Sequence, residues 1–262
     1  MASNNMAGMV RFHLGEPELA RAHLSQSTAL YEPQRDAALY PVYLMNFGVF
    51  GRFYLALATQ ILGFSDAARR IAAEALVLAE GLNQPHTSGF AMMANFNTAV
   101  MRGDADAALP MAEQCIAFSG QFGFPEFIAM AKMARGWALA HGQQRWEEGL
   151  SEVQAGLTGW AQTGFENWQP WFSTLAAEIM ARIGRQDQAL PAIDHQLSRI
   201  AANGERQFLS PLLAERAAAL AAMPGRRAEA AVVFDQAAAL ASAQGAVAWG
   251  QRIALRRQQA LG

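Results

Sequence analysis

Residues 90–125 read FAMMANFNTAVMRGDADAALPMAEQCIAFSGQFGFP, and this stretch decides the fold. It contains two apolar segments, Phe90–Met101 and Ala107–Phe122. Apolar residues recur in them three and four positions apart, which is typical of amphipathic helices. Arg102-Gly103-Asp104 separates the two segments, and Gly123-Phe124-Pro125 ends the second. The stretch therefore predicts two helices joined by a short turn.

Two sets of glycines indicate that this unit repeats along the chain. The turn inside each unit is marked at spacings of 40, 39, 42 and 41 residues by Gly63, Gly103, Gly142, Gly184 and Gly225. The end of each unit is marked at spacings of 42, 41, 40 and 41 residues by Gly81, Gly123, Gly164, Gly204 and Gly245. Glycine suits the residue after a helix because it adopts the left-handed conformation without a Cβ clash. A fixed period of this length predicts a solenoid.

The sequence therefore predicts one all-α domain over residues 1–262, a TPR-like α-α superhelix. We expect a right-handed solenoid of about six helix pairs and a C-terminal capping helix. Its units cover about residues 1–32, 48–84, 86–124, 125–165, 168–205 and 206–245, and residues 246–262 form the cap. Expected outer helices include Ser65–Glu80 and Trp146–Gln162, and no segment has the period-two pattern of a strand. The leading helix is short, so we expect the native protein to extend before Met1, because a stub leaves an apolar face uncovered.

Composition narrows the class of protein. The 262 residues are 52% hydrophobic and 16% charged, with a formal net charge of −2. Such a chain can bury a large core, and its near-neutral charge gives no reason to expect a nucleic-acid partner. One cysteine, Cys115, excludes an internal disulfide. Residues 1–10 lack a secretory signal, so a cytoplasmic location is expected.

The stretch Ala37–Phe64 is the most apolar and raises the question of a membrane. Its one charged residue, Arg52, lies near the centre, where a charge is costly in lipid. Pro41 and Gly48 interrupt the stretch. It therefore predicts a buried helix pair, and no membrane partner is expected.

Aligned on the turn glycines, the units resemble tetratricopeptide repeats (TPR). Five residues after the turn, where this family has a small residue, stand Ala20, Ala68, Ala108, Ala189 and Ala230. Twelve residues after it, a second small position holds Ser27, Ala75, Cys115 and Ala237, whereas Gln196 departs from the pattern. The period exceeds the roughly 34 residues of ordinary TPR units. In this respect the chain resembles the longer variant found in large bacterial signalling ATPases.

A narrower resemblance rests on runs such as FHLGE at residues 12–16, LGFSDA at 62–67 and RGWALA at 135–140. These runs resemble the C-terminal TPR region of bacterial proteins that carry a class III adenylate cyclase-like domain and an AAA-type (STAND) ATPase ahead of the repeats. The resemblance covers nearly the whole chain but departs at Asn46–Phe50, where such proteins have a more polar loop. It implies a non-enzymatic regulatory arm. Its partner would be a protein or peptide, or the ATPase and cyclase domains of a longer parent.

No constellation for catalysis, a cofactor or a metal is found in the sequence. A Walker A loop needs Gly-Lys-Ser/Thr, but the only lysine, Lys132, stands between Ala131 and Met133. The five histidines are scattered over different units without ligand spacing. Cys115 falls at a small-residue packing position with no evident histidine partner, which indicates a buried thiol. Asp104 follows a turn glycine and is expected to cap a helix. We therefore expect no enzyme, cofactor or metal.

The TPR resemblance implies that the inner helices line a concave groove. Aligned on the turn glycines, the groove-facing positions are Phe53, Met93, Asn97, Lys132, Trp171, Thr174, Glu178, Arg182 and Glu215. This mixture of aromatic and charged side chains suits a peptide or helix partner, although each residue could instead be structural or solvated. Two other functions stay open: a free-standing TPR adaptor, and a small-molecule sensor that uses a Trp-rich pocket around Trp168 and Trp171.

Overall fold

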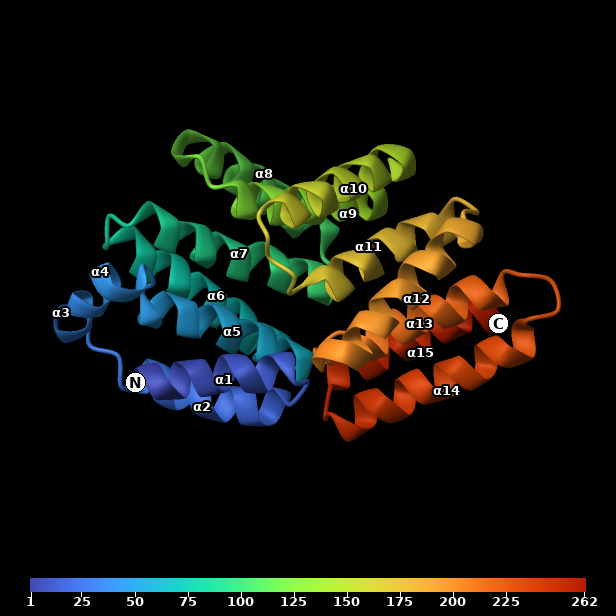
Figure 1. Ribbon diagram of the computed structural model, residues 1–262, viewed down its shortest axis with the longest axis horizontal. Coiled ribbons are helices and arrows are strands. Elements are labelled where there is room, and N and C mark those ends of the chain that lie inside the picture. Colours follow the sequence, from blue (N-terminus) through green and yellow to red (C-terminus); the bar gives the residue numbers. More distant parts are fainter.

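The computed structural model describes residues 1–262, and its regular structure is entirely helical (Figure 1). Seven inner helices follow the chain: α1 (Ala2–His13), α5 (Phe47–Ile61), α7 (Pro85–Arg102), α9 (Pro125–Gln143), α11 (Gln169–Arg182), α13 (Leu209–Ala221) and α15 (Val247–Leu261). Six outer helices alternate with them: α2 (Pro17–Ala29), α6 (Ser65–Glu80), α8 (Ala105–Phe122), α10 (Trp146–Gln162), α12 (Gln186–Asn203) and α14 (Arg227–Ala243). Each outer helix packs on the inner helix before it, and consecutive inner helices also touch. The predicted all-α superhelix of about six pairs with a final single helix is confirmed.

The irregular part of the array lies between the first two pairs. Three short elements occupy it, α3 (Pro33–Asp36), η1 (Ala37–Leu39) and α4 (Tyr40–Tyr43). The Asp36 carboxylate is buried, accepts a hydrogen bond from the backbone N–H of Glu32 (2.9 Å) and pairs with Arg35 (2.8 Å). The connection is therefore a folded insertion.

The glycines act at helix ends as predicted, with two exceptions. Eight of the ten have positive φ, for example 77° at Gly184. Gly81 and Gly142 do not, and Asn83 (φ 50°) and Gln144 (φ 57°) adopt the left-handed conformation instead. At the second site the reason is that α9 continues to Gln143, one residue beyond the expected turn. The turn is thus shifted by two residues within an otherwise regular array.

Inner and outer helices differ in how much of their surface is buried. In α5, 14 of 15 residues are buried, because other helices pack around it. In α6 only one stripe is buried, Ala68, Ala72, Ala75 and Ala79, whose small side chains allow close approach to α5. No single helix combines the length and apolar composition needed to cross a bilayer. Only the segments Pro33–Tyr43 and Phe47–Ile61 taken together do, and they are bent by 90°.

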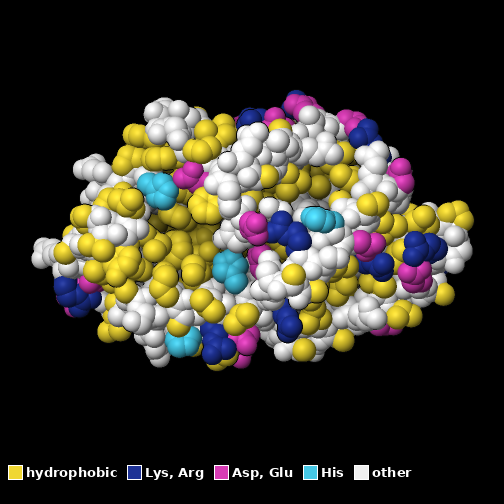
Figure 2. Space-filling view, in the orientation of Figure 1, with side chains coloured by type: hydrophobic (Ala, Val, Ile, Leu, Met, Phe, Trp, Pro, Cys, Tyr) yellow, Lys and Arg dark blue, Asp and Glu magenta, His cyan; other side chains and the backbone are white.

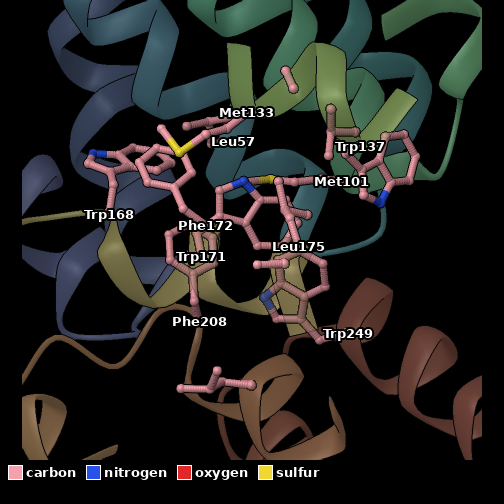
Figure 3. Close-up of a cluster of buried hydrophobic side chains, with 14 of the residues drawn as sticks. Leu57, Met101, Met133, Trp137, Trp168, Trp171, Phe172, Leu175, Phe208 and Trp249 are labelled. Carbon is pink, nitrogen blue, oxygen red and sulfur yellow. The ribbon is translucent and has the colours of Figure 1, made fainter. Parts of the chain in front are cut away.

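Aromatic side chains fill the inside of the superhelix and join its two ends (Figure 3). The ring of Trp171 lies 5.1 Å from Phe208 and 5.5 Å from Trp249 on α15. From the other end of the chain, Phe12 on α1 approaches Trp168 at 5.9 Å. On the face shown in Figure 2, apolar side chains gather in a hollow over α5 and α7. The first pair therefore closes on the later pairs, and their side chains occupy the interior.

Two glycine substitutions test the role of the left-handed helix ends. Gly184→Ala should lower the free energy of unfolding by about 1 kcal/mol, because alanine is strained at this φ. A Cβ there would meet no atom within 4 Å, so the cost is purely conformational. The matched control is Gly120→Ala inside α8, also free of contacts, which should raise stability by about 0.5–1 kcal/mol. Urea denaturation followed by circular dichroism measures both. Equal effects of the two substitutions would contradict the assignment.

Candidate functional site

Buried polar contacts hold the first helix pair against the loop between α12 and α13. The backbone N–H of Arg206 donates to the carbonyl of His13 at 2.8 Å. The carboxylate of Glu205, 7% exposed, accepts from the backbone N–H of Trp168 (2.9 Å) and the amide of Gln207 (2.7 Å). Burial alone would raise the pKa of Glu205, but His13 and these N–H donors hold it below its usual value. The closed array thus depends on an ionised, buried carboxylate.

Trp168 is held in an unusual backbone conformation at this point. Its φ is 68°, although a bulky residue seldom adopts the left-handed region, and its side chain is 2% exposed. The hydrogen bond from its backbone to Glu205 and the packing of its ring on Phe208 (5.3 Å) and Phe53 (5.7 Å) compensate for the strain. Trp168 is therefore a fixed part of the core.

A polar cavity of about 570 Å³ lies at the C-terminal ends of α5, α7, α9 and α11, beside α15. Each of the six inner helices from α5 to α15 contributes at least one side chain to its wall. In chain order, examples are Gln60, Met101, Trp137, Arg182, Glu215 and Arg252. The cavity therefore gathers side chains from units far apart in the sequence.

Two carboxylates in the wall are neutralised by arginines of α15. Glu178 accepts from Arg252 Nη2 at 2.6 Å and from the indole N–H of Trp137 at 3.1 Å. Burial alone would raise the pKa of Glu178, but Arg252 and these contacts hold it below its usual value. Glu215 accepts a two-pronged interaction from Arg256, at 3.0 Å from Nε and 2.9 Å from Nη2. The cap helix thus supplies the counter-charge of the inner face.

His141 is the titratable group at the centre of this wall. Its ring stacks on Trp137 with centroids 4.9 Å apart, and its Nε2 is 3.7 Å from Glu178 Oε2. Nε2 is buried and has no hydrogen-bond partner. Burial lowers the pKa of His141, and the positive charges of Arg252 and Arg182 lower it further, while Glu178 opposes them. The ring is therefore neutral near pH 7.

The nine predicted groove residues lie in two different environments. Six are at most 4% exposed, namely Phe53, Met93, Asn97, Trp171, Thr174 and Glu215. Lys132 and Glu178 are half-buried and Arg182 is exposed. Of the nine, Glu178, Arg182 and Glu215 meet in the cavity, whereas the other six do not line it. A binding role for the nine stays a prediction. The six residues that do not line the cavity are buried in the interior or packed beside it.

Sequence reasoning missed the cavity residues supplied by α15. Arg252 and Arg256 are four positions apart and therefore share one face of the helix, which is the signal that could have identified them. His141 carries no such signal, because its place depends on the packing of Trp137 and Trp146 around it.

The surroundings of Asp104 and Cys115, which were considered as catalytic candidates, fit roles in capping and packing. The Asp104 carboxylate accepts from the backbone N–H of Ala107 at 3.0 Å, so its predicted capping role is confirmed. Cys115 is fully buried, and burial raises the pKa of its thiol to about 11. No three His, Cys, Asp or Glu side chains converge closely enough to hold a metal ion.

The paired charges of the cavity can be tested by removing one partner. Glu178→Gln should lower the free energy of unfolding by about 2–3 kcal/mol, because it leaves the guanidinium of Arg252 partly buried without a counter-charge. The control, Glu148→Gln, breaks an ion pair with Arg145 of the same 2.6 Å length but about half exposed. It should cost at most about 1 kcal/mol. Urea denaturation of both variants makes the comparison, and a smaller loss for Glu178→Gln would contradict this reading.

Comparison with known proteins identifies the fold. No protein-family model and no curated protein matches the chain. Among solved structures, the crystal structure of the apo form of RapI is similar, with a TM-score of 0.59 and 11% sequence identity. The likeness covers 99% of this chain and 96% of the RapI chain. RapI is a TPR-like helical repeat protein, and at this identity the likeness concerns the fold alone. The chain therefore has a TPR-like helical repeat fold.

Proposed function

We propose that this chain is a non-enzymatic regulatory module that binds a segment of a partner protein at the polar cavity. The observation that carries the proposal is the composition of the wall, to which six inner helices contribute side chains. A TPR-like repeat fold of this kind suggests protein or peptide partners. Aromatic side chains of the chain itself fill the middle of its interior. The cavity offers both room for a ligand and charged groups to bind it.

The wall is suited to recognition because its polar groups have fixed positions. Glu178 accepts hydrogen bonds from Trp137 and Arg252, and Glu215 is held by both prongs of Arg256. The volume of about 570 Å³ lies in the usual range for ligand sites and is far too small for a folded domain. A short extended segment or a few side chains of a partner would fit.

A second candidate function is a small-molecule sensor, which the cavity volume of about 570 Å³ favours. The site for such a molecule would be the cavity wall at Trp137 and His141. Trp168 and Trp171 are 2% and 0% exposed and present almost no surface to a ligand.

For the wider context, we propose that the module serves as the C-terminal arm of a bacterial signalling protein with a cyclase-like domain and a STAND-type ATPase. The resemblance of residues 12–16, 62–67 and 135–140 to such proteins supports this assignment. The DNA upstream of Met1 tests it. We expect the reading frame to continue through further repeats to a Gly-x-x-x-x-Gly-Lys-Ser/Thr loop. A stop codon and ribosome-binding site just before Met1 would favour a free-standing adaptor instead.

Two charge reversals test whether the cavity binds the partner. Immobilised protein should capture a partner from a lysate of the source organism, and Arg182→Glu at the cavity should abolish this capture. The control is Arg69→Glu on α6, whose side chain is 70% exposed on an outer helix. It should leave capture unchanged. Retention of capture in Arg182→Glu would overturn the proposal.

A further inference from the structure

The cavity wall contains more positive than negative side chains, and this difference indicates the charge of the ligand. The lining residues include two carboxylates and four guanidinium groups, namely Glu178, Glu215, Arg102, Arg182, Arg252 and Arg256. With His141 neutral, the lining side chains alone carry an excess of two positive charges, and Asp104 beside Arg102 reduces this to one. Such an excess of positive charge in a concave wall attracts anions, because the protein around it screens charge less than bulk water does.

The ion pairs identify which arginine is free to bind. Arg252 and Arg256 are engaged by Glu178 and Glu215. Arg102 pairs with Asp104 at 2.6 Å. Arg182 takes part in no ion pair, since no carboxylate oxygen lies within 4.0 Å of its nitrogen atoms. Its guanidinium is therefore the one cation of the cavity wall without a carboxylate partner.

Arg182 is nevertheless held in position. Its guanidinium carbon lies 5.8 Å from the ring centroid of Trp146, a distance at which cation–π attraction operates. This contact leaves the N–H donors at the edge of the guanidinium available for hydrogen bonds, because the ring of Trp146 attracts the positive charge and accepts none of these N–H groups. An arginine fixed in this way can bind a carboxylate or phosphate through two parallel hydrogen bonds.

A second unsatisfied group lies in the same wall. His141 Nε2 is buried without a hydrogen-bond partner, although buried polar atoms normally have one. Glu178, at 3.7 Å, is too far away for a hydrogen bond and is already bonded to Arg252 and Trp137. Nε2 is covered by its neighbours, so a ligand oxygen bound to Arg182 could accept a hydrogen bond from an Nε2–H tautomer of His141 after a small shift of the ring.

We propose that the cavity is an anion-binding site in which Arg182 binds a carboxylate or phosphate group of the ligand and His141 lies beside that group. The proposal rests on the proposed function, because it specifies the chemistry of what the cavity holds. Two sources share this chemistry, a free small organic anion and an acidic side chain of the partner segment. The same arginine would bind either.

Calorimetric titration of the purified chain with defined probes tests the proposal. The free-anion probes are succinate and inorganic phosphate. The peptide probe is acetyl-Gly-Glu-Gly-amide, with acetyl-Gly-Gln-Gly-amide as its neutral control. Ionic strength is held constant with sodium chloride so that screening does not change. At least one anionic probe should bind, and Arg182→Gln should weaken its binding about tenfold or more, the loss expected for a charge-assisted hydrogen bond. Arg182→Lys, which keeps the charge without the fork, should give an intermediate loss.

Arg69→Gln is the matched control and should change the affinity by less than about twofold, because Arg69 does not line the cavity and its side chain is 70% exposed to screening solvent. Circular dichroism verifies that each variant is folded. Binding of succinate or phosphate without the peptide assigns the site to a free organic anion. Binding of the Glu peptide without the Gln peptide assigns it to an acidic side chain. The proposal is overturned if no anionic probe binds at millimolar concentration, or if Arg182→Gln binds as tightly as the unmodified chain.

The two proposals can fail separately. If partner capture depends on Arg182 while no anionic probe binds, the anion site is wrong and the protein-binding function stands. If anions bind through Arg182 while capture is indifferent to Arg182→Glu, the anion site stands and the protein-binding function is wrong.

Discussion

The structure depends on the contact that closes the superhelix, between the end of α1 and the loop before α13. A backbone hydrogen bond joins Arg206 to His13, and the buried carboxylate of Glu205 binds the backbone of Trp168. A buried carboxylate is costly unless it is fully hydrogen-bonded, so these contacts must form together. Because they do, Phe12 reaches the ring of Trp168, and the first pair helps to fill the interior. An array of neighbour-only contacts would lack this coupling.

Closure explains why the inner face differs from an open groove. Side chains that point inward from opposite sides of the superhelix form one continuous packed cluster. Phe53 packs on Trp168, Trp168 on Phe208, and Phe208 on Trp171. The polar cavity lies at the C-terminal ends of the inner helices, and there the side chains are charged. Glu178 and Glu215 can be held in such a place because α15 brings one arginine to each. The cap helix therefore has an electrostatic role in addition to covering the apolar end.

The sequence predicts the local structure well because local signals determine it. The helices Ser65–Glu80 and Trp146–Gln162 were expected at the residues where they are found, since turn residues and apolar spacing mark both ends. The same signals identify inward-facing positions such as Trp171 and Glu215. They do not give the curvature of the superhelix, which accumulates from small rotations between units. Whether an inward position is open or filled depends on that curvature. For this reason the burial of Trp171 and the approach of Arg256 to Glu215 needed the structure.

The location of the cavity bears on how a ligand there could regulate the protein. Its wall joins Gln60 and Met101 from the first half of the chain to Arg252 and Arg256 from the last helix. These groups come from opposite halves of the chain, and the contact between α5 and α15 brings them together. Opening the superhelix would therefore separate them. A ligand shifts a conformational equilibrium only through a difference in its affinity for the two states. A ligand that needs both sides of this wall has such a difference, because opening the array would separate its contacts. Binding at the cavity and closure at His13 and Glu205 are then linked equilibria, and each should favour the other.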